Sequence, residues 1–259
     1  MEPVTPTRLR WGALAWLLTL QFFVVETIAQ SRYEGPYSRA GDTISTLGTW
    51  HSAAHLVMNA SFVAQAVLIL AGALLIRPVL LRAAGQVAPV LLTVSAAGVL
   101  LVGAFPSDGN ALVHAIGAVA HFVGGGLGLI ALAYAVRPRS EILGTALAAL
   151  GLVGTAATVF FLTGVTEYLG KGGTERVAAY VLPVGLAMAG AALWRLATPA
   201  ASDRQAEREA ARAEQAERAR ERDAALEAAA RRTPERPDTG TADDDELDDH
   251  WAPVQRRRD

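Results

Sequence analysis

The sequence predicts an all-α, polytopic membrane protein: a six-transmembrane-helix bundle followed by a cytoplasmic tail that is first helical and then disordered. Six long apolar runs fill residues 1–196 of the 259-residue chain, which contain 11 basic and 8 acidic residues. Residues 197–259 contain 12 basic and 17 acidic residues and no apolar run. This contrast indicates a membrane domain at 1–196 joined to a charged, soluble tail.

Each apolar run is long enough to cross a bilayer as a helix. About 20 helical residues span a hydrocarbon core of ~30 Å, and a backbone in lipid must satisfy its hydrogen bonds within the helix. Globular core helices of this length carry a polar face, and these runs carry almost none. The runs are Trp11–Gln30, His51–Ile76, Gln86–Phe105, Ala111–Val136, Ile142–Val165 and Val177–Leu196.

The first run also has features of a secretory signal peptide. It follows a basic start and ends near small residues. A retained helix is favoured over a cleaved one, because the small-x-small cleavage pattern around Ala29 is poor.

The arginines predict the orientation of the bundle. Basic residues are more numerous and closer to the helix ends on one side, which by the positive-inside rule is the cytoplasmic side. We therefore expect both termini in the cytoplasm and loops 31–50, 106–110 and 166–176 outside. Only one of the 23 basic residues is a lysine, a usage typical of GC-rich bacterial genomes, so we expect a bacterial plasma membrane. The cytoplasmic flanks contain Arg8, Arg10, Arg77, Arg82, Arg137, Arg139 and Arg195.

The tail divides into two parts. Residues 197–232 are rich in alanine, glutamate and arginine, which favour a helix, and Glu214 and Arg218 form an i,i+4 pair. Leu226 is the lone large apolar residue, so a solvated single helix is favoured over a coiled coil. Residues 233–259 are charged and proline-containing, and we expect them to be disordered. Their acidic and basic runs offer a contact for a cytoplasmic protein partner, and no nucleic-acid motif is present.

Polar and ionisable side chains gather at the predicted outer ends of the helices. Such groups are costly within a membrane and usually face a bundle interior or a water-filled cavity. The inner halves contain only Ser, Thr, one Gln and one Tyr as polar residues. The outer groups are Glu26, His51, His55, Asn59, Asp108, Asn110, His114 and His121.

The stretch "AFPSDGNALVHAIGAVAH" (104–121) is the densest of these sites. Pro106 ends one helix because it lacks an amide hydrogen, and Ser107, Asp108 and Asn110 are all suitable N-caps for the next, with Asp108 favoured as a cap in the outer turn. His121 lies in a row with small residues four positions away on either side. Because small residues let helices approach closely, we expect His121 to face a neighbouring helix.

Two chemical roles compete with simple packing for these residues. His51, His55, Asp108 and His114 are candidate metal ligands, since histidines at i,i+4 are a common zinc spacing. The full signature is absent, because "HSAAH" lacks the intervening glutamate. Ser45 with a histidine and an aspartate is a second candidate, as a hydrolytic set. The chain has no cysteine, which excludes thiol chemistry, and no motif calls for a cofactor.

Several of these residues resemble a known family. "YSRAGDTISTLGTW" (37–50), Asn59, "GAFPSD" (103–108) and His114 are similar to the prokaryotic membrane family catalogued as domain of unknown function 998. The resemblance covers about residues 11–196 and implies six helices and no established activity. Members often have an acidic residue in the Ser-x-Leu-Gly turn, where this chain has Thr46. Because Thr46 has no carboxylate, we expect Asp42 and Asp108 to be the acidic residues of the site.

The sequence therefore predicts a polar pocket at the outer leaflet that binds a lipid headgroup or small ligand without catalysis. The alternative is a metal-assisted intramembrane hydrolase or transferase that acts on a lipid. Membrane lipids are the expected partners. We further expect Asp42 and Ser45 to lie beside the Pro106–Asp108 turn, with His114 between them and His55 nearby. The expected ligand-binding residues are Glu26, Asp42, Ser45, His51, His55, Asn59, Asp108, His114 and His121.

Overall fold

The computed structural model describes the backbone of residues 5–80, 83–196 and 199–232, and it confirms the helical membrane architecture. Within that part of the chain, six helical segments are long and apolar enough to cross a membrane. The helices are α1 (Pro6–Leu18), α2 (Gln21–Ser31), α3 (His55–Ile76), α4 (Ala84–Ala104), α5 (Ala111–Val136), α6 (Glu141–Thr163), α7 (Gly170–Leu196) and α8 (Pro199–Arg232), with short 3₁₀ turns η1 (Ile44–Gly48) and η2 (Arg77–Val79).

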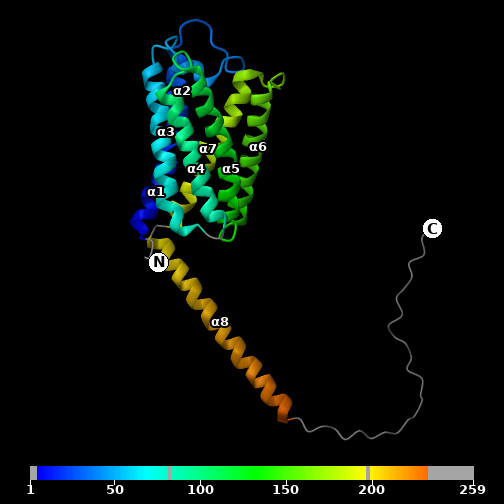
Figure 1. The fold of residues 1–259 in the computed structure, drawn as a ribbon. Coiled ribbons are helices and arrows are strands. Elements are labelled where there is room, and N and C mark those ends of the chain that lie inside the picture. The colour runs from blue at the N-terminus through cyan, green and yellow to red at the C-terminus, as the bar shows by residue number, and fades with distance from the viewer. Residues whose placement is uncertain (1–4, 81–82, 197–198, 233–259) are drawn as a thin grey trace, which may run out of the picture. The chain divides into compact units, whose positions relative to one another are not determined.

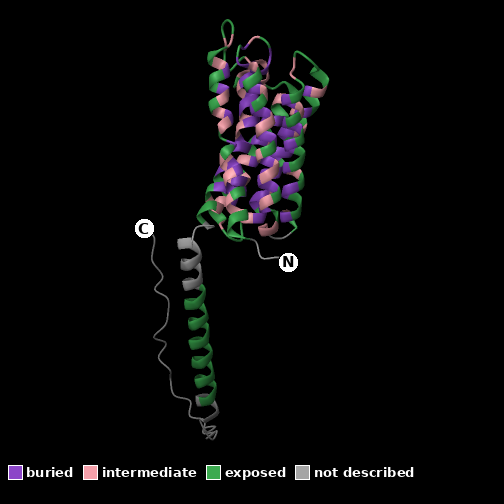
Figure 2. Ribbon diagram, turned by 90° about the vertical axis from the view of Figure 1, so that its left-hand side faces the viewer, coloured by how far each residue is buried: buried purple, intermediate pink, exposed green. Residues whose placement is uncertain are grey.

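The membrane helices form one bundle (Figure 1), and their contacts follow a closed ring in chain order. Each helix from α3 to α7 packs against the next one, and α1 closes the ring by packing against both α3 and α7. Short connections between consecutive helices make neighbours antiparallel. Buried residues lie mainly on the inward faces of the helices, and exposed residues lie on the outer surface that would face lipid (Figure 2).

The first span is broken into α1 and α2. Thr19 is fully buried, and its hydroxyl donates to the carbonyl of Trp16 at 2.6 Å. The amides of Thr19 and Leu20 bond three residues back rather than four. A back-bonded threonine of this kind tightens and bends a helix, so the span Pro6–Ser31 contains two helices.

Glycines bring α4 and α5 into backbone contact. A Cβ placed on Gly98 would lie 2.4 Å from the amide nitrogen of His121 and 2.5 Å from the carbonyl oxygen of Gly117. Only glycine permits so close an approach. The crossing sets His121 directly against Ser95 of α4, as the sequence predicted for a neighbouring helix.

The α2–α3 segment, residues 32–54, lies at the same end of the bundle as the α4–α5 and α6–α7 turns (Figure 1). Its two ends are tied together, because Glu34 N donates to His51 O at 2.8 Å and Ala53 N donates to Arg32 O at 2.9 Å. The three loops predicted to lie outside therefore share one end. That this end faces out of the cytoplasm stays a prediction.

Helix α7 begins earlier than the sequence predicted. The apolar run suggested a start at Val177, whereas the helix starts at Gly170 and includes Glu175 and Arg176. The α2–α3 segment covers this first turn: the carbonyl of Ala40 accepts from the amides of Gly172 and Gly173, at 2.8 and 3.1 Å. A covered first turn allows two charged residues to be buried inside the helix.

Helix α8 is described by itself. It is 34 residues long, the side chains of residues 209–228 are exposed, and Arg218 pairs with Glu214 at 2.6 Å. The disorder predicted for residues 233–259 falls outside the described residues.

Candidate functional site

Two buried polar clusters lie under the α2–α3 segment, and consecutive residues of α7 anchor them. Arg176 anchors the first, which we call the arginine cluster: Glu26, Tyr37, Arg39, Arg176 and Tyr180. Glu175 anchors the second, which we call the serine chain: Ser45, His114 and Glu175. Each cluster joins residues that are far apart in the sequence.

The arginine cluster is saturated with partners. Arg176 and Glu26 are 5% and 1% exposed, and Arg176 Nε donates to Glu26 Oε1 at 2.9 Å. The Nη1 group of Arg176 donates to the carbonyls of Asp42 and Gly172, at 2.8 and 3.1 Å, and to that of Arg39. Its Nη2 group donates to the Tyr37 hydroxyl. Every guanidinium nitrogen thus has an acceptor, as a buried cation requires.

The remaining members complete the same network around Glu26. The Tyr180 hydroxyl donates to the second carboxylate oxygen of Glu26. Arg39, which is half exposed, donates to the Tyr180 hydroxyl at 2.7 Å and lies 3.7 Å from Glu26 Oε1. The cluster therefore fastens the α2–α3 segment to both α2 and α7.

Tyr37 lies in the α2–α3 segment, outside the membrane spans. Burial raises the pKa of its hydroxyl above the ordinary value, and the adjacent Arg176 guanidinium opposes that rise. The hydroxyl accordingly stays protonated and donates to the carbonyl of Thr43 at 3.2 Å. Tyr37 is thus a neutral link between Arg176 and its own loop.

The serine chain is built by η1, α5 and α7. Ser45 Oγ lies 3.0 Å from Glu175 Oε1 and 3.0 Å from His114 Nε2. His114 Nδ1 lies 2.9 Å from the carbonyl oxygen of Phe105, the last residue before the α4–α5 turn. The other oxygen of Glu175 accepts from the amide of Ile44. Glu175 and His114 are buried, at 3% and 7% exposure.

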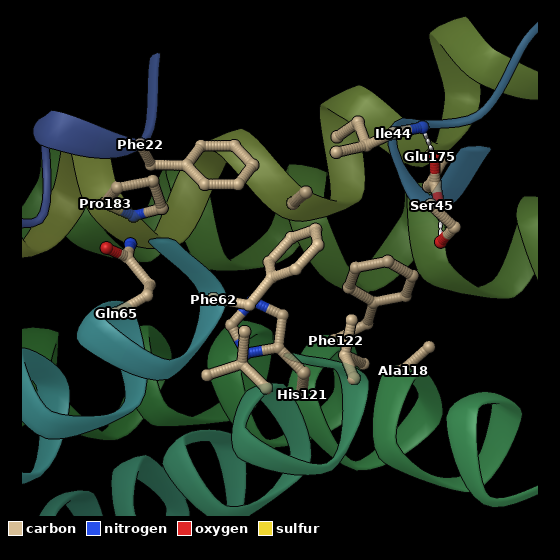
Figure 3. A pocket seen from close by; sticks show the side chains of 13 residues that line it. Phe22, Ile44, Ser45, Phe62, Gln65, Ala118, His121, Phe122, Glu175 and Pro183 are labelled. Carbon is tan, nitrogen blue, oxygen red and sulfur yellow. Dashed lines mark hydrogen bonds between the residues drawn. The ribbon is translucent and has the colours of Figure 1, made fainter. Parts of the chain in front are cut away.

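An internal cavity begins at Ser45 and Glu175 and runs between the helices (Figure 3). Its walls are mainly apolar, with Phe22, Phe62 and Phe122 among them. Gln65 and His121 are the other polar side chains that reach it. The volume open to a water-sized sphere is about 30 Å³. A water needs ~10–15 Å³ by the same measure, so there is room for about two water molecules.

Two of the predicted site residues, Ser45 and His121, line this cavity. Ser45 meets His114, a third predicted residue, in the serine chain. His121 lies further along the cavity, where its Nδ1 faces the Ser95 hydroxyl at 2.9 Å. Glu26 belongs to the arginine cluster instead.

The other predicted residues do not join them. His51 stacks on Trp50 with ring centroids 3.8 Å apart, and His55 Nδ1 faces the carbonyl of Ser52 at 2.8 Å. Asn59 donates to the carbonyl of Gly48 at 2.8 Å and so supports η1. These contacts are local and structural.

The aspartates differ most from expectation. Asn110, not Asp108, caps α5 by accepting from Val113 N at 3.1 Å. Asp108 accepts from Trp50 N at 3.1 Å, which does bring the first loop beside the α4–α5 turn. Asp42 was expected at that turn too. Its carboxylate instead accepts from Ser38 N within its own loop, and its carbonyl contacts Arg176.

The metal candidates are not assembled into a site. Across the described residues, no three His, Asp or Glu side chains come together in a way that could hold a metal ion. His51, His55, Asp108 and His114 each have the separate partners given above.

Sequence reasoning missed the residues that anchor both clusters, Glu175 and Arg176. It treated them as outer-loop charges because the apolar run starts after them. The signal was present: an acidic and a basic residue stand directly before a membrane run, and Tyr180 follows Arg176 at i+4, on the same helix face.

The fold and these clusters define an integral, multi-pass membrane protein with buried polar groups at one end of its bundle. Residues 17–203 match the model of the family described as "Protein of unknown function (DUF998)". The chain belongs to this family. No curated protein and no solved structure matches it.

Proposed function

We propose that this membrane protein binds the headgroup of a lipid, or a small ligand of the same chemistry, at the serine chain without catalysis. One observation carries the proposal: Ser45, His114 and Glu175 come from three separate elements and meet at Ser45, and Ser45 and Glu175 line an internal cavity. Buried polar groups at such a junction are costly unless they are satisfied. A binding role accounts for their convergence at the end of the bundle that we predict to be the outer one.

The size of the cavity limits how a ligand enters. Pockets for drug-sized ligands have volumes of ~300–1,000 Å³, far more than the roughly 30 Å³ open here. Residues 32–54 must therefore shift outward before a headgroup reaches Ser45. The segment is held by hydrogen bonds, by the arginine cluster and by the buried side chains of Ile44 and Leu47. Opening of this kind must break these contacts, and it is a local event if the helices stay packed.

The charges favour a ligand without net negative charge. Arg176 is the buried cation nearest to Glu175, and Glu26, Tyr37 and three carbonyls already use its nitrogens. A phosphate or carboxylate that approaches Ser45 would meet Glu175 with no free cation beside it. A zwitterionic headgroup with a terminal ammonium suits the carboxylate and the serine oxygen better.

A second candidate function is a serine-dependent hydrolase or transferase that acts on a lipid. Ser45 Oγ lies 3.0 Å from His114 Nε2, and a carbonyl holds the other ring nitrogen. This is the nucleophile–base contact that such enzymes need. Two features oppose it: the carboxylate bonds to the serine rather than to the histidine, and the nearby Ile44 amide serves Glu175, so it cannot bind an oxyanion.

The binding proposal is tested with the detergent-purified chain and short-chain lipids. Phosphatidylethanolamine should raise the melting temperature in a saturable way, by several degrees at ~100 times the dissociation constant, where binding contributes about 2.7 kcal/mol. Phosphatidylglycerol, which is anionic, should have little effect. Free ethanolamine distinguishes a small solute from a lipid, because a site for the headgroup alone responds to it.

Two variants locate the effect. Ser45→Ala should abolish the response to phosphatidylethanolamine, whereas Thr158→Val should retain it. Thr158 is the matched control, since it is a buried hydroxyl that bonds only to its own helix in α6. An equal response in Ser45→Ala would place binding elsewhere. Covalent labelling of Ser45 by a fluorophosphonate would favour the enzyme.

A further inference from the structure

The serine chain requires one more hydrogen than its side chains ordinarily supply. Two contacts meet at Ser45 Oγ, one to Glu175 Oε1 and one to His114 Nε2, each 3.0 Å long. A hydrogen bond needs a hydrogen between its two heavy atoms, and a serine hydroxyl has a single one. The other must come from the carboxyl group or from the imidazole.

The tautomer of His114 is fixed by its second contact. His114 Nδ1 lies 2.9 Å from the carbonyl oxygen of Phe105, which accepts and never donates. Nδ1 therefore carries a hydrogen. A neutral His114 consequently has a bare Nε2 toward Ser45, and only an imidazolium presents a hydrogen there.

With an ionised Glu175 and a neutral His114, both partners of Ser45 are acceptors. The serine can then satisfy one of them, and the other is left buried beside an oxygen with no hydrogen between them. Unsatisfied buried groups cost about 1–3 kcal/mol, and more if they are charged. One additional proton removes this defect.

We propose that Glu175, Ser45 and His114 form a proton-binding site that holds one shared proton. In one form Glu175 is protonated and donates to Ser45, which donates to the neutral His114. In the other form the His114 imidazolium donates to Ser45, which donates to the Glu175 carboxylate. Both hydrogen bonds are complete in both forms.

The two forms interconvert without any other reactant. The carboxyl hydrogen of Glu175 moves to Ser45 Oγ while the serine hydrogen moves to His114 Nε2, and the reverse step restores the first form. The net charge of Glu175, Ser45 and His114 together is zero in both forms. The cavity lined by Ser45 and Glu175 has room for about two water molecules, which could carry a proton to these groups.

The charged neighbours of Glu175 are Arg176 and Glu26, which have opposite charges and are paired with each other at 2.9 Å. Tyr37 is a neutral hydroxyl bonded to Arg176. His121 of α5 faces Ser95 of α4, and Asp108 of the α4–α5 turn faces the amide of Trp50. Among the described residues of these elements, no other carboxylate or imidazole is hydrogen-bonded to Ser45, His114 or Glu175.

The bound proton also holds η1 in place. Glu175 accepts from the amide of Ile44 through one oxygen and contacts Ser45 through the other. Loss of the proton removes the hydrogen from one of the two Ser45 contacts. This proposal concerns the contacts alone, so it stands or falls independently of lipid binding.

The test detects the proton by two spectroscopic signals in the purified full-length protein at pH 7.5. Infrared difference spectroscopy against Glu175→Gln reports a protonated Glu175, and ¹⁵N NMR against His114→Asn reports an imidazolium. We expect these two populations together to account for one proton per chain. An ionised Glu175 with a neutral His114 would overturn the proposal.

Variants separate sharing from simple protonation. Glu175→Gln mimics the protonated form, because its amide donates to Ser45 and its oxygen accepts from Ile44, so His114 should be neutral with the hydrogen on Nδ1. Ser45→Ala should abolish both the carboxyl signal and the imidazolium signal at pH 7.5. If both signals persist in this variant, the proton is not shared through the serine. Glu141→Gln, an exposed change at the start of α6, should leave both signals unchanged.

The wild-type protein alone provides a second measurement if a variant fails to fold. As the pH is raised, the carboxyl and imidazolium signals should decline together with one midpoint, since strongly coupled groups titrate as a pair. Separate midpoints would overturn a shared proton.

Discussion

The arginine cluster and the serine chain lie side by side at one end of the bundle, yet they differ in hydrogen-bond supply. In the arginine cluster, donors and acceptors match, and each nitrogen of Arg176 has a partner. In the serine chain, two acceptors compete for the one hydrogen of Ser45. A matched network fixes a structure, whereas an undersupplied one responds to protons or ligands. We therefore assign a structural role to the arginine cluster and a response to protons or ligands to the serine chain.

The largest expected effect comes from removing the centre of the matched cluster. Arg176→Met leaves Glu26 buried without its main partner, which costs about 3–5 kcal/mol. The melting temperature of the purified protein should fall by about 6–20 °C, at roughly 2–4 °C per kcal/mol. Trypsin should also cut the loosened α2–α3 segment at Arg32 or Arg39.

A paired substitution sharpens this result. Replacing both buried charges, Glu26→Leu with Arg176→Met, should recover part of the lost stability, because no unpaired charge remains. A double variant that is less stable than Arg176→Met alone would show that the contacts of Glu26 with Tyr180 and Arg39 outweigh the cost of leaving its charge without Arg176.

The next effect distinguishes a responsive network from a fixed one. Ser45→Ala removes both contacts of the serine and should cost about 1–3 kcal/mol. Glu175→Gln should cost little, because its amide supplies the missing hydrogen.

The proposed proton also makes a prediction about pH. Unfolded glutamate and histidine lose their protons at about pH 4.3 and about pH 6.5.

The folded wild type would therefore hold one proton more than the unfolded chain above about pH 6.5, so its stability should fall as the pH rises. Glu175→Gln should lose that dependence. Melting curves between pH 6 and 9 measure it, and parallel curves for the two proteins would contradict the difference between the clusters.

The sequence was sufficient for the membrane helices because hydropathy depends on each run by itself. It was insufficient for Glu175 and Arg176 because their burial depends on residues 32–54 folding back over α7, which no local pattern encodes. The sequence did bring Ser45 and His114 together, through the need of a half-buried imidazole for partners. It named Asp108 as the nearby carboxylate, whereas Glu175 is the carboxylate that contacts Ser45. Glu175 was missed because it had been assigned to a loop.

Differences of two or three residues in position account for the other errors. Any of the polar residues between Pro106 and Ala111 is chemically able to cap α5, and the backbone geometry of the turn selects Asn110. Asp42 and Ser45 are three residues apart, but the η1 turn begins between them, at Ile44, and directs them to different partners. Such choices depend on backbone angles that composition does not fix.

Close packing of the segment against α7 offers a smaller effect that both clusters share. A Cβ on Gly172 would lie 2.0 Å from the carbonyl oxygen of Asp42, so Gly172→Ala must displace the loop backbone. Overpacking of this kind costs about 1–3 kcal/mol. Gly173→Ala is the matched control, since its Cβ would lie 3.2 Å from the Leu169 side chain and an ordinary 3.9 Å from the Ala40 backbone. Equal melting temperatures for the two variants would mean that the loop yields without loss.

The smallest expected effect is at Tyr37, the neutral link of the arginine cluster. Tyr37→Phe removes the hydroxyl that accepts from Arg176 and donates to Thr43, at a cost of about 0.5–1.5 kcal/mol. Because burial raises the pKa of this hydroxyl in the folded protein, its contribution is complete below the unfolded value of about 10 and is lost as the pH rises through the folded pKa. The wild type should therefore lose stability at alkaline pH, and Tyr37→Phe should lose less. Melting curves from pH 8 to 11 measure this difference. Tyr168→Phe is the control, because Tyr168 is 91% exposed. If Tyr37→Phe follows the wild-type curve at every pH, the ionisation of Tyr37 does not limit the matched cluster, and its alkaline sensitivity must arise from another group.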